Sequence, residues 1–169
     1  MSKANKSNKA IKYRLYPNDE QKVMFAKTFG CCRFVYNQLL ALQKQRYKDG
    51  ESHLSKLKSN EFATRTLKKD YDFLKEIDKF AVSNAVFHLA DAYDRFFKKQ
   101  NHFPKFKSKR KSKKSYTTNF TNNNILIGKN VIKLPKVGMV KAVIHKLPKD
   151  DWKLKSVTVS PVSYTHLRA

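Results

Sequence analysis

Cysteine, glycine and long apolar runs are scarce in this sequence of 169 residues. The two cysteines, Cys31 and Cys32, are neighbours, and a disulfide between adjacent residues is strained, so a disulfide framework is excluded. No apolar run reaches the roughly 18 residues of a membrane-spanning helix, and the opening MSKANKSNKA lacks the apolar core of a signal peptide. We therefore expect a cytoplasmic protein in a reducing compartment.

Acidic residues are scarce as well. The sequence has 37 Lys and Arg against 13 Asp and Glu, a net charge of +24. Such a charge repels itself and favours a polyanionic partner, nucleic acid first and an anionic membrane surface second. After Asp94 the next acidic residue is Asp150, with 16 Lys and Arg between them, which is typical of a phosphate-binding surface. The alternative for the centre of this run, KFKSKRKSKK, is a solvated disordered segment.

Helical patterns fill the first half of the chain. Asn18 can cap a helix through a capping box. Gly30 then interrupts the apolar pattern, which predicts two helices joined by a turn, a hairpin over residues 18–48. A weaker helical pattern covers residues 55–69, and a broad apolar stripe follows Asp78, the expected N-cap of the last helix.

Strand patterns occur at both ends of the helical region, so the predicted fold class is α+β. Residues 11–17 alternate apolar and polar side chains. Beyond Pro104, short apolar runs separated by turn residues predict four or five antiparallel strands up to Val159. A lone first strand must satisfy its backbone groups, so we expect it to pair with the later strands. The helices are then an insertion into a small β-barrel or curled sheet; the alternative is two domains side by side.

The cysteine pair lies in FGCCRFVYN, residues 29–37. A zinc site needs four ligands, usually in spaced pairs, and a redox motif needs C-x-x-C. A cysteine nucleophile needs a partner base, and the sequence does not indicate one. The favoured interpretation is structural, with small side chains that let two helices approach. Arg33 can reach a phosphate or be an exposed helical arginine. A DNA-reading helix-turn-helix has similar spacing.

The stretch HFPKFKSKRKSKKSY mixes cations with aromatics. Phe103, Phe106 and Tyr116 either stack on unpaired bases or anchor the segment to the core. The Asn and Thr side chains of residues 115–124 either contact bases, sugars and phosphates or form turns. The expected contacts to a nucleic-acid backbone are Arg33, Lys105, Lys107, Lys109, Arg110, Lys111, Lys113 and Lys114.

Signals for catalysis are poor. A two-metal nuclease needs several converging carboxylates, whereas the acidic residues here lie mostly along the predicted helices. Asp91 and Asp94 are one helical turn apart and favour surface ion pairing. The sequence has no Gly-rich phosphate loop, no G-x-S-x-G and no H-E-x-x-H.

Several motifs together resemble the N-terminal half of the OrfB/TnpB family of transposon-associated proteins, over roughly residues 9–160. They are YRLYPNDEQ, KTFGCCRFVYN, FLKEIDKFA, HFPKFKSKRKSKKSYTTNF and IKLPKVGMVKAVIH. The resemblance implies an RNA-guided DNA endonuclease in which a wedge-like β-barrel is interrupted by a helical recognition domain. It also implies a guide RNA and target DNA as partners, with no membrane.

The resemblance further implies site residues. Lys79, Phe80, Thr121 and Asn122 match positions that contact the motif flanking the DNA target. Ser83 matches another such position, where family members can carry a longer amide. Ser55 aligns where an aromatic can occur.

The resemblance stops near the end of the sequence. The closing PVSYTHLRA, residues 161–169, does not resemble the family, and we expect it to be non-native. By resemblance, the catalytic carboxylates, the Mg²⁺ site and the zinc-binding cysteines lie beyond this point. We therefore expect no cofactor in this chain and no cleavage by it alone.

The predicted organisation follows from these patterns and the resemblance. Its parts are a flexible basic N-terminus (1–9), an incomplete β-barrel (10–17 and 115–160), a helical recognition domain (18–104) and a basic linker (105–114). The predicted function is binding of guide RNA and target-flanking DNA in a transposase of this type. The alternatives are a standalone helix-turn-helix regulator and, more weakly, an RNA-associated structural protein.

Overall fold

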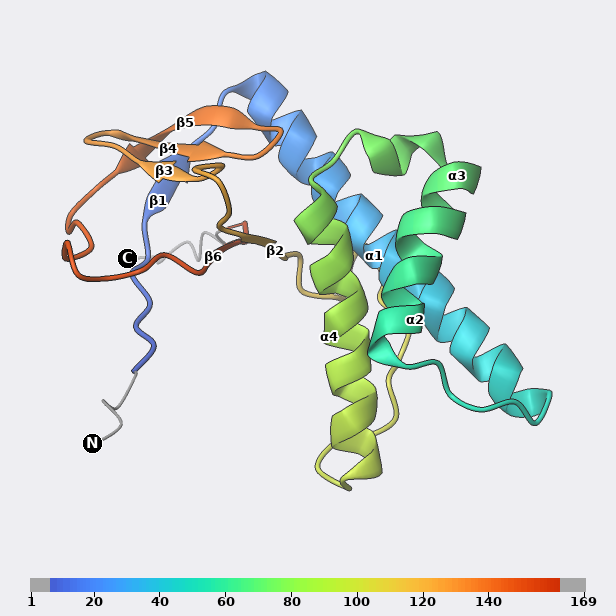
Figure 1. Cartoon of the computed structure of the whole chain (residues 1–169). Helices are drawn as coiled ribbons and strands as arrows, with labels where there is room; N and C mark the ends of the chain where they lie inside the picture. Colours follow the sequence, from blue (N-terminus) through green and yellow to red (C-terminus); the bar gives the residue numbers. More distant parts are fainter. Residues whose placement is uncertain (1–6, 162–169) are drawn as a thin grey trace, which may run out of the picture.

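The structure is a computed structural model that describes residues 7–161, so the start of the expected N-terminal arm and nearly all of the expected non-native tail lie outside the described residues. Strands and helices are both present, which confirms the α+β class (Figure 1). The elements are β1 (Arg14–Tyr16), α1 (Asp19–Lys48), α2 (Lys56–Glu61), the π-helical η1 (Phe62–Leu67), α3 (Lys68–Asp70), the 3₁₀ turn η2 (Asp72–Lys75), α4 (Lys79–Phe97), β2 (Tyr116–Asn119), β3 (Leu126–Ile127), β4 (Val131–Leu134), β5 (Gly138–Val143) and β6 (Ser156–Val159).

Helix α1 is a single continuous helix, so the predicted hairpin over residues 18–48 is wrong. The predicted capping box is present, because the Asn18 side chain accepts a hydrogen bond from the Gln21 backbone and the Gln21 side chain accepts one from the Asn18 backbone. Gly30 lies inside the helix. A helical glycine costs only about 1 kcal/mol relative to alanine, and the buried stripe continues at helical spacing on both sides of it, from Phe25 to Leu40.

The strands form two antiparallel sheets. One has the order β1-β5-β4-β3 and the other pairs β2 with β6. Strand β1 pairs with β5, with Leu15 opposite Ala142, which confirms the prediction that the first strand pairs with a late one and that the helices are inserted between them. The described strands form these two sheets rather than a closed barrel.

The helical layer is built on the contact between α1 and α4, which lie side by side in Figure 1. Val35, Leu39 and Val82 are completely buried. Cys32 is buried in the same contact, where its thiol donates to the Ala81 carbonyl at 3.4 Å. Burial raises the pKa of the Cys32 thiol to about 12. This confirms the structural interpretation of the cysteine pair.

The N-terminus of α4 is joined to strand β2 by buried hydrogen bonds. Asp78, the predicted N-cap, accepts a hydrogen bond from the Ala81 backbone at 3.2 Å and from the Thr118 hydroxyl at 2.6 Å. Asn84, farther along α4, donates to the Thr117 carbonyl at 2.9 Å. The start of α4 and the end of β2 are therefore held in fixed positions relative to each other.

We expect the Asp78–Thr118 bond to stabilise the fold. Thr118→Val should lower the free energy of unfolding by about 1–3 kcal/mol, because the buried carboxylate loses a donor that valine cannot replace. Thr117→Val is the control, since its hydroxyl meets that of Thr158 at an exposed site. Urea unfolding followed by circular dichroism measures both variants, and equal losses would contradict a special role for the buried bond.

Candidate nucleic-acid interface

A hollow of about 450 Å³ opens beside the N-terminus of α4. Lys79 and Phe80 come from α4, and Thr121 and Asn122 come from the connection between β2 and β3. The structure therefore brings together four of the five residues that the sequence predicted as DNA contacts, although about 40 positions separate the two pairs. Ser83 is half-buried on α4 and is not among the residues lining the hollow. We call this feature the α4 hollow.

The loop that carries Asn122 has a fixed backbone. The Asn124 side chain accepts from the Thr121 backbone at 2.8 Å and donates to the Asn119 carbonyl at 2.9 Å. Asn122 and Asn123 have φ values of 47° and 56°, in the left-handed region that asparagine tolerates better than most residues. This geometry leaves the Asn122 side chain exposed at the rim of the hollow.

Lysines dominate the charge of the α4 hollow. The Lys79 ammonium lies 5.1 Å from the centroid of the Phe80 ring. Lys68, Lys75 and Lys136 also line the hollow, and sequence reasoning missed all three as site residues. Burial lowers the pKa of Lys68. The charge of Asp78 raises this pKa, whereas the charges of Lys79 and Lys136 lower it further.

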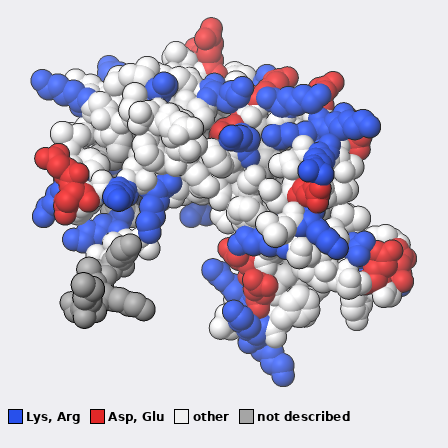
Figure 2. Space-filling model, in the orientation of Figure 1, with Lys and Arg blue, Asp and Glu red and all other residues white. Residues whose placement is uncertain are grey.

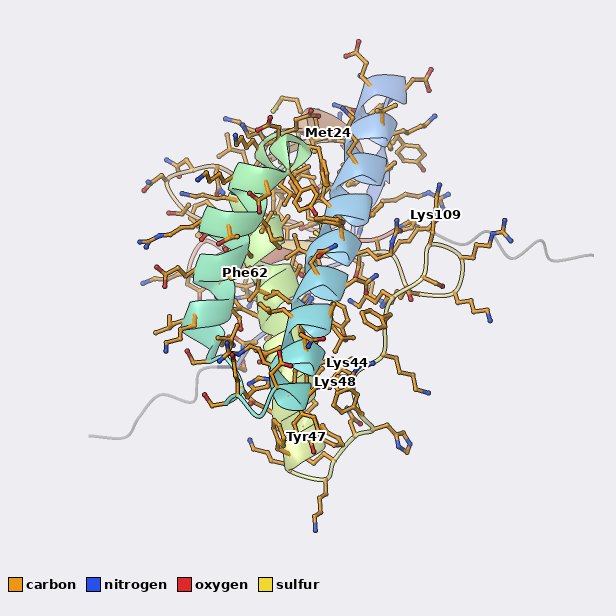
Figure 3. All side chains as sticks on the ribbon, turned by 90° about the vertical axis from the view of Figure 1, so that its right-hand side faces the viewer. Met24, Lys44, Tyr47, Lys48, Phe62 and Lys109 are labelled. Atoms are coloured by element: carbon orange, nitrogen blue, oxygen red, sulfur yellow. The ribbon has the colours of Figure 1, made fainter. Side chains whose placement is uncertain are left out.

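The basic segment, residues 105–114, packs against α1. The Asn37 side chain binds the backbone of Lys107 twice, donating to its carbonyl at 2.9 Å and accepting from its N–H at 2.8 Å. Ser108 and Ser112 close a turn, since the Ser112 hydroxyl accepts from the Ser108 N–H at 2.8 Å. Figure 3 shows Lys109 on a loop that stands off the side of α1. The exposed cations of the segment are Lys105, Lys109, Arg110, Lys111, Lys113 and Lys114.

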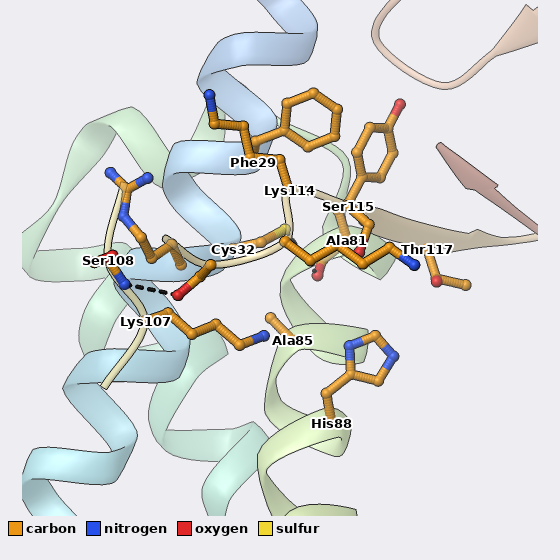
Figure 4. A pocket seen from close by; sticks show the side chains of 14 residues that line it. Phe29, Cys32, Ala81, Ala85, His88, Lys107, Ser108, Lys114, Ser115 and Thr117 are labelled. Carbon is orange, nitrogen blue, oxygen red and sulfur yellow. Dashed lines mark hydrogen bonds between the residues drawn. The ribbon is translucent and has the colours of Figure 1, made fainter. Parts of the chain in front are cut away.

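The segment and the two long helices enclose a narrow cleft, drawn in Figure 4. Arg33 from α1 meets Lys107, Lys113 and Lys114 there, so the predicted phosphate contacts from two parts of the sequence come together. Residues of α4, among them Ala85, form the opposite wall. The enclosed space is only about 20 Å³.

The structure separates the three aromatic residues of the basic stretch. Tyr116 is buried against Phe25 and Phe29, so it is an anchor. Phe103 and Phe106 remain 40% and 51% exposed. The Lys44 ammonium lies 5.5 Å and 4.7 Å from the centroids of these two rings.

Other predicted features have plain structural roles. Ser55 is the N-cap of α2, where its hydroxyl accepts from the Lys58 N–H at 3.3 Å. Asp91 forms an ion pair with Lys56 at 3.3 Å, as predicted for that face. Figure 2 shows Lys and Arg spread over both halves of one face, with Asp and Glu in smaller groups among them. Within residues 7–161, no cluster of three or more His, Cys, Asp or Glu could hold a metal ion, and no helix is long and apolar enough to cross a membrane.

Comparisons with known proteins point in one direction. A family model described as a helix-turn-helix domain, HTH_OrfB_IS605, matches residues 5–52. A Streptomyces pristinaespiralis protein named "Putative RNA-guided DNA endonuclease" is 35% identical over 108 residues, and InsQ of Escherichia coli, which carries the same designation, is 30% identical over 106 residues. These alignments cover 63% and 59% of this chain but only 27% and 25% of the relatives. The chain thus spans about a quarter of their length.

A shorter relative is covered almost completely. Virulence protein VsdF of Salmonella dublin is 32% identical over 111 residues, which are 60% of this chain and 93% of that protein. The matched helix-turn-helix region corresponds to β1 and the single helix α1 in this structure. From the family model and the relatives together, we conclude that the chain belongs to the OrfB/TnpB family, of which it covers the N-terminal part.

Proposed function

We propose that this chain is a nucleic-acid-binding part of an RNA-guided DNA endonuclease of the transposase type. In this proposal the basic segment and its cleft hold the backbone of a nucleic acid, either the guide RNA or the target DNA. The α4 hollow contacts the DNA that flanks the target. The two sheets are part of a wedge-like β-barrel, and the catalytic carboxylates with Mg²⁺ and the zinc-binding cysteines belong to a further part of the protein, so this chain alone does not cut.

The observation that carries the proposal is the convergence in the α4 hollow. An amide, a hydroxyl, a lysine and an aromatic ring from separated elements line one open space. An asparagine side chain can form two hydrogen bonds with the edge of one base, and a lysine can bind guanine or a phosphate. The hydrogen bonds that fix the loop and the helix supply the rigidity that base reading needs.

The charge distribution supports a polyanionic partner for the basic segment. None of the ion pairs between described residues uses a side chain of residues 105–114. Such cations are available to phosphates without first breaking an internal pair. The standalone regulator depended on a helical hairpin, and the continuous α1 removes that support.

The hollow can be tested through two adjacent residues. Asn122→Gly removes the side chain while keeping a residue that accepts a positive φ, and we expect discrimination at a base pair to fall by about 1–3 kcal/mol. Selection of bound sequences from a randomised DNA duplex library measures this. The matched control is Asn123→Gly, which also has a positive φ but does not line the hollow.

The sequence preference of the two variants decides whether Asn122 reads a base. Loss of sequence preference in Asn122→Gly alone supports base reading by that amide. The same preference in the wild type and both variants would show that Asn122 reads no base.

The basic segment can be tested by its salt dependence. Replacing Lys109, Arg110 and Lys111 with glutamine should make the plot of log binding constant against log salt shallower, by about 0.9 for each duplex phosphate that the variant no longer neutralises. The control replaces Lys48, Lys58 and Lys98 with glutamine, which removes the same charge from exposed positions in or next to the helices. Fluorescence anisotropy with a labelled duplex at several salt concentrations gives both slopes. If the two triple variants change the slope equally, only net charge matters and the segment has no special role.

A further inference from the structure

Lys107 differs from every other cation of the basic segment. It is half-buried, while the other Lys and Arg of residues 105–114 are exposed. Asn37 fixes its backbone on both sides through two hydrogen bonds. Its side chain crosses the cleft toward α4, close to Ala85 and His88 in Figure 4, and its ammonium lies 4.2 Å from the centroid of the Tyr36 ring.

The cleft offers this ammonium no acidic partner. None of the 14 residues that line it is Asp or Glu, and no carboxylate within the described part of the chain forms an ion pair with Lys107. The thiol of Cys32 stays neutral, because its pKa is raised to about 12. The titratable groups that face Lys107 or line the cleft are Cys32, Arg33 and Tyr36 from α1, His88 from α4, and Lys113, Lys114 and Tyr116 from the segment and β2.

This arrangement works against the charged form of Lys107. Loss of solvation lowers the pKa of its ammonium. The pKa of His88 is also lowered, first by loss of solvation and then by the charge of Lys107. A partly desolvated cation without a counter-ion destabilises the free protein. An anion that enters the cleft removes that penalty.

The size of the cleft limits the anion. The interior of the cleft has room for about one water-sized group, about 20 Å³. One phosphate oxygen can therefore enter, whereas a base or a sugar cannot. The Lys107 ammonium has three donors, and Arg33, Ser115 and Thr117 are further polar residues that line the cleft. The mouth continues into the exposed cations of the basic segment, which favours a polyanion over an isolated carboxylate.

We propose that the cleft between α1, α4 and residues 107–117 is a socket for one backbone phosphate of a nucleic acid, with Lys107 as its central contact. This proposal rests on the proposed nucleic-acid binding. It adds that one particular phosphate of the bound strand lies in this cleft. The phosphodiester belongs to an RNA strand or a DNA strand, and the experiment separates these sources.

The test compares Lys107→Met with Lys109→Met in the full chain. Both variants lose one charge and keep a long side chain, but only Lys107 lies in the cleft. Affinity is measured for an RNA duplex and a DNA duplex of the same sequence, and the melting temperature is measured without nucleic acid. We expect Lys107→Met to bind roughly tenfold more weakly, as for loss of a charge-assisted hydrogen bond, with an unchanged or higher melting temperature. Lys109→Met should bind only slightly more weakly.

The opposite directions of the two readouts distinguish a ligand site from a packing role. A Lys107→Met variant that melts lower and binds more weakly would make Lys107 a structural residue and overturn the socket. Equal affinity losses in both variants would overturn it as well. A wild-type chain that binds neither duplex would instead refute the proposed function. A tenfold loss with only one duplex assigns the phosphate to that type of strand.

A titration of the lysine ammonium groups by NMR is a second readout. The pKa of Lys107 should lie below its ordinary value in the free protein and rise when the duplex binds, because phosphate stabilises the charged form. In the free protein, stability should increase with pH between the lowered and the ordinary pKa of Lys107, since the unfolded chain binds more protons there. A Lys107 pKa that does not respond to the duplex would overturn the socket.

Discussion

The contact between the start of α4 and strand β2 positions every candidate site in this chain. Its centre is the buried Asp78 carboxylate, which accepts from Thr118 on β2 and from the first turn of α4. Lys79 and Phe80 follow directly and line the α4 hollow, while Ala81 and Tyr116 line the cleft. The hollow and the cleft therefore flank one hydrogen-bonded contact between α4 and β2.

Charge is distributed unevenly between the helical region and the stretch that follows Asp94. In and around the helices, lysines and arginines form ion pairs with nearby acids, such as Lys27 with Glu76 at 2.9 Å. The stretch after Asp94 has no acids until Asp150, so its cations repel one another in the free protein. Binding a polyanion relieves that repulsion and stabilises the folded chain by mass action. Stability and nucleic-acid binding are thus linked through the same side chains.

Sequence reasoning predicted what local rules encode. The cap at Asp78, the capping box at Asn18 and the pairing of β1 with a late strand follow from side-chain chemistry and from unsatisfied backbone groups. The turn at Gly30 was wrong because tertiary burial on both sides of a glycine outweighs its weak helix propensity. Lys68, Lys75 and Lys136 were missed because only the fold brings α3, η2, α4 and the β4–β5 turn around one hollow. No spacing in the sequence encodes that arrangement.

The run KFKSKRKSKK illustrates the same limit at the scale of single residues. Lys107 and Lys109 are two positions apart and chemically identical, so composition assigns them equal roles. The fold distinguishes them through Asn37, which is 70 positions away from Lys107 and fixes only that backbone. One lysine consequently loses solvent while the other keeps it. The energetic value of a phosphate contact depends on this loss of solvation, so the count of charges in a basic run does not determine which of them matters most.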